Sequence, residues 1–230
     1  MTQAELGTVV VTGGASGLGA AVAAAVFEAG GTPVVLDRAR PPFGVDHELV
    51  DLADTRAAEA AVRRVAHQHG GLSAVVTAAG TDACGRLDDT PGEAWERVVQ
   101  VNLLGTVAVI RAALPMLEAA GGKVVTVAST LGLRALPDAT AYCASKFGVV
   151  GFTRALAAET AGRVGVTLLV PGGMQTAFFD DREERYRPPA DAKLNRPEDV
   201  AAAVVFALRQ PPGCELREMV LCPSMESSWP

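Results

Sequence analysis

Short runs of β-branched and other apolar residues alternate along the chain with longer, alanine-rich stretches. The short runs predict about seven strands, at Thr8–Thr12, Thr32–Leu36, Glu48–Leu52, Leu72–Thr77, Gly122–Ala128, Val164–Val170 and Glu218–Cys222. The longer stretches predict helices at Gly17–Ala29, Thr55–His69, Glu93–Leu117, Ala139–Thr160 and Pro197–Arg209. Because the strands are apolar on both faces, helices are expected to cover both sides of a parallel sheet.

This alternation predicts the α/β class: a single Rossmann-like, doubly wound parallel sheet of about seven strands with helices on both faces. The chain has 230 residues and shows no linker, repeat or low-complexity tract, so residues 1–230 are expected to form one domain. The stretch Ala177–Asn195, between the sixth strand and the last helix, is rich in charge and proline. A loop of that length in a compact domain is typical of an active-site lid.

The chain is acidic overall, with 20 Lys and Arg residues against 26 Asp and Glu residues and a net charge of −6. Such a chain has no general attraction for nucleic acid or anionic lipid. No stretch approaches the roughly 18–20 uninterrupted apolar residues that a membrane span needs, and the first residues lack the basic region of a signal peptide. We therefore expect a cytoplasmic protein without a nucleic-acid or membrane partner.

The four cysteines and three histidines show no spacing that is typical of a metal site or a disulfide framework. No metal is therefore expected. The cysteines are expected to be reduced thiols, as is usual in the cytosol.

A glycine-rich turn follows the first predicted strand and directly precedes a helix. It reads Thr12-Gly13-Gly14-Ala15-Ser16-Gly17-Leu18-Gly19. Glycines allow a tight turn and let a pyrophosphate approach the free N–H groups at the helix N-terminus. Gly13, Ser16, Gly17, Leu18 and Gly19 are therefore candidate dinucleotide-binding residues. The alternative is a turn that serves only close packing of the helix against the strand.

Acidic residues end the second and third predicted strands. Asp37 lies about twenty residues beyond the glycine turn, where a carboxylate accepts hydrogen bonds from the adenosine ribose and repels a 2′-phosphate. This position favours NAD over NADP, although the following Arg38 could pair with a phosphate. Asp51 and Leu52 close the third predicted strand, where a carboxylate can meet the adenine amino group. Asp54 is predicted to cap the next helix.

Three further side chains are candidates for proton transfer. Tyr142 and Lys146 are four residues apart on a predicted helix and therefore share one face. Ser129 lies just past the fifth predicted strand, at the sheet edge where open α/β folds bind ligands. Tyrosine is a poor base at its ordinary pKa of about 10, but an adjacent ammonium group favours the phenolate.

Taken together, these motifs make the chain similar to the classical short-chain dehydrogenases/reductases over nearly its whole length. The matching pieces, in chain order, are the turn Thr12–Gly19, Asp51, Ala79-Gly80, Asn102, Ser129, Tyr142 with Lys146, Pro171-Gly172 and Thr176. One departure is Thr77-Ala78, where the family usually has two asparagines that brace the sheet.

The resemblance implies a role for each member of the catalytic set. Tyr142 would be the general acid/base, and Ser129 would hydrogen-bond the substrate oxygen. Lys146 would hold the nicotinamide ribose and lower the pKa of Tyr142. Asn102 would bend its helix and hold a water that relays protons to Lys146.

The resemblance also assigns the remaining cofactor contacts. Ala79 and Gly80 would face the cofactor. Thr176 and the backbone around Pro171, Gly172 and Met174 would fix the nicotinamide carboxamide.

The implied activity is the interconversion of a secondary alcohol and a ketone by hydride transfer, with NAD favoured over NADP. An NADPH-dependent ketoreductase is the alternative, supported only by Arg38. A dinucleotide-sensing regulatory protein without turnover is a further alternative, but the Ser–Tyr–Lys set is intact. The implied partner is a small-molecule alcohol or ketone, and the two longest helices resemble those that pair in family homodimers and homotetramers.

The predicted lid combines two phenylalanines, Phe178 and Phe179, with three arginines, Arg182, Arg185 and Arg187. The phenylalanines could cover the nicotinamide while an arginine binds an anionic substrate. Alternatively, the phenylalanines belong to a small core and the arginines pair with Asp181, Glu183 and Glu184 on a solvated surface. Mixed-sign charge runs favour the solvated surface for the arginines.

Overall fold

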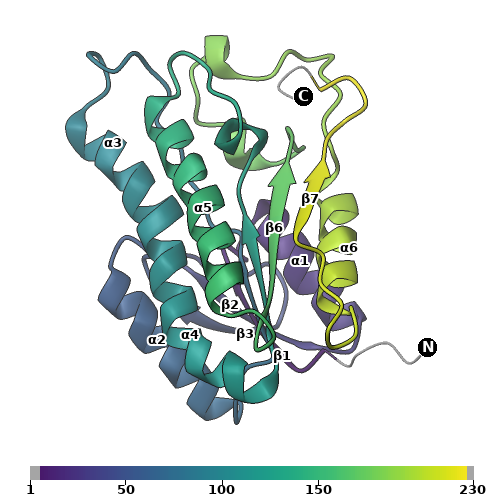
Figure 1. The fold of residues 1–230 in the computed structure, drawn as a ribbon. Coiled ribbons are helices and arrows are strands. Elements are labelled where there is room, and N and C mark those ends of the chain that lie inside the picture. The colour runs from purple at the N-terminus through teal and green to yellow at the C-terminus, as the bar shows by residue number, and fades with distance from the viewer. Residues whose placement is uncertain (1–5, 227–230) are drawn as a thin grey trace.

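The computed structural model describes residues 6–226, in which one parallel sheet carries helices on both faces (Figure 1). The strands are β1 (Thr8–Thr12), β2 (Thr32–Asp37), β3 (Asp46–Leu49), β4 (Ala74–Thr77), β5 (Lys123–Val127), β6 (Gly165–Pro171) and β7 (Glu218–Leu221). They lie in the order β3-β2-β1-β4-β5-β6-β7, and every neighbouring pair is parallel. The predicted doubly wound α/β fold is confirmed.

Alternate strand residues enter two large core clusters on opposite faces of the sheet, and a third, smaller cluster includes Leu168 and Val170 of β6. The helices are α1 (Gly17–Glu28), α2 (Thr55–Gln68), α3 (Gly92–Val99), α4 (Thr106–Ala120), α5 (Thr140–Glu159) and α6 (Pro197–Leu208). Val10 and Val34 join the core that includes α2 and α4, whereas Val9 and Val11 join the core of α1 and α6. Both faces are therefore buried, which explains why the strands lack a polar face.

The third strand differs from the sequence prediction. It spans Asp46–Leu49 rather than Glu48–Leu52, so Asp51 and Leu52 do not close a strand. The reason is local, because Asp51 Oδ1 accepts a hydrogen bond from the Ala53 N–H at 2.9 Å and turns the chain before α2. Asp54 caps α2, as predicted, by accepting hydrogen bonds from two backbone N–H groups.

The predicted helix Glu93–Leu117 consists of three consecutive segments. A six-residue π-helical stretch, η1 (Gln100–Gly105), joins α3 to α4. The continuous run Gly92–Ala120 is long and apolar enough to cross a membrane by length and composition alone. The part of this run that forms α4 packs in the core, where it buries Val109 and Ile110.

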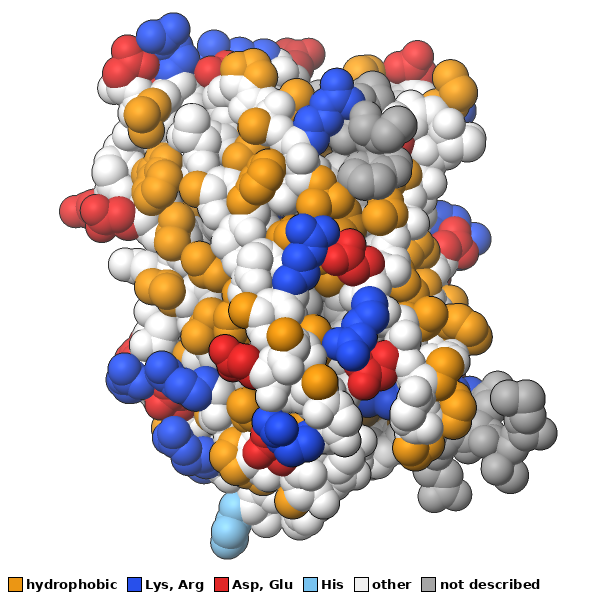
Figure 2. Space-filling model, in the orientation of Figure 1, with side chains coloured by type: hydrophobic (Ala, Val, Ile, Leu, Met, Phe, Trp, Pro, Cys, Tyr) orange, Lys and Arg blue, Asp and Glu red, His pale blue; other side chains and the backbone are white. Residues whose placement is uncertain are grey.

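Some large apolar side chains remain on the surface of this helical layer. Leu104 of η1 is 46% exposed, and Phe147 of α5 is 45% exposed. Figure 2 shows hydrophobic side chains spread over the face that α4 and α5 form in this view.

The topology also defines where a ligand can bind. The chain order runs outward from β1 to β3 on one side and from β4 to β7 on the other, so the topological switch point lies between β1 and β4. The carboxyl ends of the strands point toward residues 177–195, at the top of Figure 1. Open α/β sheets bind ligands at this edge.

Candidate active site

The glycine turn lies at the carboxyl end of β1. Gly13 has a φ of 72° and Gly17 a φ of 51°, in the left-handed region that favours glycine. A Cβ on Gly19 would lie 2.2 Å from the Gly13 carbonyl oxygen, so only glycine permits this approach. Ser16 makes no side-chain cap for α1, so the first-turn N–H groups are left for an anion. The Leu18 side chain is buried in the core, and only its backbone can face a ligand.

Ala79 and Gly80 follow β4 and run beside the glycine turn. The Ala79 N–H donates a hydrogen bond to Thr12 Oγ1 at 3.1 Å. A Cβ on Gly13 would lie 2.7 Å from the Ala79 Cα. The structure therefore brings these two predicted cofactor segments together across the switch point.

Asp37 connects the end of β2 to the glycine turn. Its Oδ2 accepts a hydrogen bond from the Ala15 N–H at 3.0 Å, and its Oδ1 accepts one from the Ala39 N–H at 3.0 Å. The carboxylate thus lies beside the turn, where the ribose of a dinucleotide binds in such folds. Arg38 is exposed next to it.

Asp51 has a partner that the sequence did not indicate. One Nη of Arg97, in α3, lies 2.8 and 3.0 Å from the two Asp51 carboxylate oxygens. Burial acts to raise the pKa of Asp51, but the Ala53 hydrogen bond and the charges of Arg97 and Arg38 outweigh it and lower the pKa. The Leu52 side chain is buried in the core, so it can offer a ligand only its backbone.

Ser129 and Tyr142 meet at the carboxyl end of β5. Ser129 begins a short 3-10 turn, Thr130–Gly132, and its Oγ accepts a hydrogen bond from the Leu131 N–H at 3.1 Å. Tyr142 lies in the first turn of α5, and its hydroxyl is hydrogen-bonded to the Ser129 side chain. Two hydroxyls from different elements therefore share one site.

Lys146 lies one turn further along α5 and is 4% exposed. Its Nζ donates a hydrogen bond to the Val127 carbonyl at 2.9 Å and lies 5.6 Å from the centroid of the Tyr142 ring. A Cβ on Gly80 would lie 3.8 Å from this Nζ, so the loop after β4 passes close to the ammonium group. Burial lowers the pKa of Lys146 to about 8, although the charge of Asp82 acts to raise it.

The pKa of Tyr142 lies above its ordinary value. Loss of water around the phenol raises it most, and the charge of Asp82 raises it further. The hydrogen bond with Ser129 and the charge of Arg182 act in the opposite direction. The sequence led us to expect a lowered pKa next to Lys146, but in this structure desolvation outweighs the favourable interactions.

Asn102 lies in the π-helical stretch η1 and is 1% exposed. Its Oδ1 accepts a hydrogen bond from the Thr81 N–H at 2.8 Å, and its Nδ2 donates to the Thr81 carbonyl at 2.9 Å. The same Nδ2 donates to Ser145 Oγ at 3.0 Å. Asn102 therefore joins the loop after β4 to α5, next to Lys146.

The segment expected to hold the carboxamide follows β6. Pro171 ends that strand, and the Gly172 N–H donates a hydrogen bond to the Leu221 carbonyl of β7 at 2.9 Å. Met174 forms an isolated bridge with Asn195, which closes the base of the loop.

Thr176 brings this segment to the glycine turn. A Cβ on Gly17 would lie 3.4 Å from the Thr176 side chain. The Thr176 Oγ1 accepts a hydrogen bond from the Phe178 N–H at 3.4 Å and begins the 3-10 turn Ala177–Phe179. The Phe178 ring lies 5.7 Å from the Tyr142 ring, so the loop reaches the proton-transfer site.

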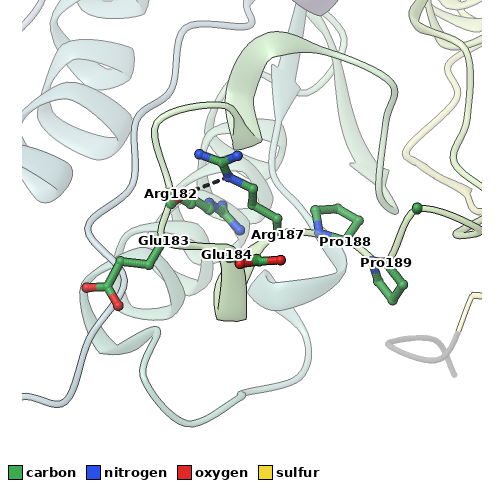
Figure 3. Close-up of a pocket in the computed structure, with 7 residues that line it drawn as sticks. Arg182, Glu183, Glu184, Arg187, Pro188 and Pro189 are labelled. Atoms are coloured by element: carbon green, nitrogen blue, oxygen red, sulfur yellow. Dashed lines mark hydrogen bonds between the residues drawn. The ribbon is translucent and has the colours of Figure 1, made fainter.

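The three loop arginines do not share one environment. Arg185 pairs with Glu183 at 2.9 Å, and both are 67% exposed, as the solvated-surface interpretation predicts. Arg187 instead donates to the carbonyls of Arg182 and Asp180 at 2.7 and 2.6 Å. Figure 3 shows the contact between Arg187 and Arg182 beside a hollow of about 650 Å³ formed by the loop itself.

For Arg182 the solvated-surface prediction is wrong. Its guanidinium lies 2.7 Å from the carboxylate of Asp82, and the two side chains are only 17% and 7% exposed. Asp82 was missed because it follows Ala79-Gly80 with no motif of its own. An acid placed just past the end of a central strand was the available signal.

Within residues 6–226, no group of three or more His, Cys, Asp or Glu residues could hold a metal ion. The glycine turn, by contrast, fits a dinucleotide, because its Cβ-free backbone opens onto uncapped N–H groups at the start of α1. A dinucleotide cradle that adjoins a Ser–Tyr–Lys cluster is the arrangement of an α/β oxidoreductase. Residues 7–187 match the family model described as short chain dehydrogenase, and the chain belongs to this family.

Known proteins support this placement. An uncharacterized oxidoreductase of Staphylococcus aureus (strain MW2) is 31% identical over 226 residues, covering 93% of this chain and 96% of that protein. Ligand-free aldohexose dehydrogenase of Thermoplasma acidophilum superposes with a TM-score of 0.86 at 22% identity, covering 95% of this chain and 93% of that one.

A second solved structure is the alcohol dehydrogenase of the archaeon Thermococcus sibiricus complexed with 5-hydroxy-NADP. It superposes with a TM-score of 0.85 at 24% identity and covers 94% of this chain and 96% of that one. These two structures establish the fold. Family membership implies a nicotinamide dinucleotide as the cofactor.

Proposed function

We propose that the protein interconverts a secondary alcohol and a ketone, with a nicotinamide dinucleotide as the hydride carrier. The observation that carries this proposal is the hydrogen bond between Ser129 and Tyr142, with the Lys146 ammonium 5.6 Å from the Tyr142 ring. All three lie at the sheet edge that holds the glycine turn. Two hydroxyls that meet there can bind one substrate oxygen and exchange a proton with it.

Tyr142 and Ser129 have different roles in the proposed proton transfer. In alcohol oxidation, Tyr142 accepts the hydroxyl proton of the substrate, and in ketone reduction it returns that proton. Ser129 holds the substrate oxygen. When bound, the dinucleotide accepts or donates the hydride and, in its oxidised form, adds a positive charge that favours the phenolate.

Lys146 and Asn102 would support this proton exchange without contacting the substrate oxygen. Because the pKa of Lys146 is about 8, its ammonium group can hold a ribose hydroxyl near neutral pH and gives up its proton more readily than an exposed lysine. Asn102 fixes the loop that carries Gly80, which lies beside Lys146.

We further propose that NAD is preferred over NADP. The support is the position of the Asp37 carboxylate, which the Ala15 and Ala39 N–H groups hold beside the glycine turn. A negative charge there repels a 2′-phosphate. The exposed Arg38 favours NADP instead, and the Thermococcus sibiricus alcohol dehydrogenase of the same fold was solved with an NADP derivative.

The surroundings in which the protein works are also proposals. The four cysteines, which show no disulfide framework, support a cytoplasmic protein. The acidic composition supports one that binds neither nucleic acid nor anionic lipid. The exposed apolar side chains on η1 and α5 support a homodimer or homotetramer.

A panel of secondary alcohols and ketones, assayed with NAD and NADP through the absorbance of the reduced nicotinamide, tests the activity. Tyr142→Phe removes the proton acceptor, and we expect kcat to fall by about 10²–10⁴-fold while the dissociation constant of the dinucleotide stays near its wild-type value. Calorimetry of both dinucleotides measures that constant and should give the lower value for NADH.

Wild-type turnover by Tyr142→Phe would contradict the mechanism. Tight dinucleotide binding without turnover of any alcohol or ketone would instead favour the regulatory protein. Tighter binding of NADPH than of NADH would contradict the proposal that Asp37 selects NAD.

A further inference from the structure

The most buried ion pair of the loop lies beside the proton-transfer site. Arg182 comes from loop 177–195 and Asp82 from the loop after β4, and their side chains meet at 2.7 Å although they are 100 residues apart. Asp82 also accepts hydrogen bonds from the Ala83 N–H and the Cys84 thiol. The pair therefore joins two segments that border the same sheet edge.

Phe178 connects this pair to the catalytic tyrosine. The Arg182 guanidinium lies 4.9 Å from the centroid of the Phe178 ring and 4.6 Å from that of Phe179. Phe178 in turn lies 5.7 Å from the Tyr142 ring. A guanidinium on two aromatic faces is held by cation–π attraction as well as by its carboxylate partner.

The groups that surround Tyr142 or act on its pKa come from several elements. Lys146 and Cys143 share its helix, Ser129 faces it from the end of β5, and Asp82 and Arg182 face it from the two loops. Of these, Asp82 is the carboxylate that raises the pKa of the phenol, and it also acts on the pKa of Lys146.

We propose that Asp82 and Arg182 are positioning residues for Tyr142: their ion pair closes loop 177–195 over the phenol and holds one negative and one positive charge beside the proton-transfer site. The proposal rests on Tyr142 being the general acid/base. It assigns these two residues a function beyond the Ser–Tyr–Lys set, because neither belongs to a motif of the sequence.

The two charges act in opposite directions, which gives the proposal a distinctive signature. The negative charge of Asp82 disfavours the phenolate, so Asp82→Asn should move the alkaline-rising limb of alcohol oxidation to lower pH. The positive charge of Arg182 favours the phenolate, so Arg182→Gln should move it to higher pH. We expect each shift to be about one pH unit, which is a change of about tenfold in rate on the rising limb.

Loss of the ion pair should also affect KM, and this effect does not depend on whether the positive or the negative charge is removed. Both variants should raise KM for the alcohol, because both break the ion pair that closes the loop. The double variant Asp82→Asn/Arg182→Gln should return the limb toward its wild-type position while KM stays high. Arg182→Lys keeps the positive charge but loses the planar guanidinium contacts. In this variant the alkaline-rising limb should stay near its wild-type pH, while KM for the alcohol should still rise.

The test measures kcat/KM for oxidation against pH at saturating dinucleotide in the wild type and these four variants. Arg185→Gln is the matched control, because it removes an arginine of the same loop from an exposed pair and should leave the limb in place. Circular dichroism verifies that each variant is folded over the pH range.

A second readout does not depend on turnover. The chain has two tyrosines, so in a Tyr186→Phe background a single tyrosine remains. Its ring carbon, labelled with ¹³C, reports phenolate formation by NMR with and without oxidised dinucleotide. The phenolate should form at lower pH in Asp82→Asn and at higher pH in Arg182→Gln.

Shifts in the same direction for both single variants, or none in either readout, would overturn the proposal. A wild-type protein that oxidises no alcohol would contradict the proposed function instead, and the NMR titration would still decide whether Asp82 and Arg182 act on Tyr142.

Discussion

Thr77 carries a buried hydroxyl group that the surrounding residues do not satisfy. It ends β4, is 2% exposed, and its Oγ1 has no hydrogen-bond partner among the described residues. The equivalent hydroxyl on β5, Thr126 Oγ1, lies 2.7 Å from Thr153 Oγ1. Two neighbouring strands thus carry a threonine at paired positions, and the hydroxyl group has a hydrogen-bond partner in Thr126 but not in Thr77.

We therefore expect opposite results from two identical substitutions. Thr77→Val removes a buried hydroxyl without a partner and should leave the free energy of unfolding unchanged or raise it by about 1 kcal/mol. Thr126→Val leaves the Thr153 hydroxyl with one partner fewer and should lower it by about 1–3 kcal/mol. Urea unfolding measures both, and equal losses would show that Thr77 has a partner after all.

At the scale of elements, the π-helical stretch η1 is the feature that organises the site. If residues 100–105 were α-helical, the side chains that follow would point in different directions around the helix axis. The stretch instead presents Asn102 to the loop after β4, where its amide satisfies both backbone groups of Thr81. A break in the helix therefore positions the loop that lies over Lys146.

Asn102→Ala should remove this brace. We expect the free energy of unfolding to fall by about 1–3 kcal/mol, because the partly buried Thr81 N–H loses its acceptor. Hydrogen exchange at the Thr81 amide should accelerate, and turnover should fall with it. Gln100→Ala, in the same stretch, is the control and should stay within about 0.5 kcal/mol of the wild type. An equal effect of the two variants would contradict the bracing role.

The elements differ in how far the sequence could predict them. The central strands and the Tyr142–Lys146 face were readable, because strong apolar runs and a spacing of four residues leave little ambiguity. The edge strand β3 was misplaced, because three of its four residues are polar and none of the four is buried. The π-helical stretch has no spacing signal, and only the family resemblance led us to expect a bend in the helix at Asn102, where the stretch lies.

At the scale of the whole molecule, long-range ion pairs were beyond sequence reasoning. Arg97 and Asp51 are 46 residues apart, and Arg182 and Asp82 are 100 apart, so no local pattern couples them. Local charge runs predicted the partner of Arg185 correctly, since Glu183 is its near neighbour. The fold alone brought the other pairs together.

The outer surface of the helical layer carries a prediction about assembly. Leu104 and Phe147 are exposed on η1 and α5, the helical segments that we propose pair between subunits. We expect a dimer or tetramer in light scattering, and Leu104→Glu/Phe147→Glu should yield monomers, because it would bury charges at the contact. Phe206→Glu, on the outer face of α6 and 60% exposed, should leave the mass unchanged. A monomeric wild type would refute the assembly.

Loop 177–195 is fastened to the remainder of the chain at two distant points, Arg182 to Asp82 and Tyr186 to Asp138. A product formed beneath the loop can leave only after both of these contacts break. Departure of product, rather than bond making, would then govern how fast the enzyme cycles. A more viscous solvent should accordingly slow the cycle more than deuterium placed on the reacting carbon.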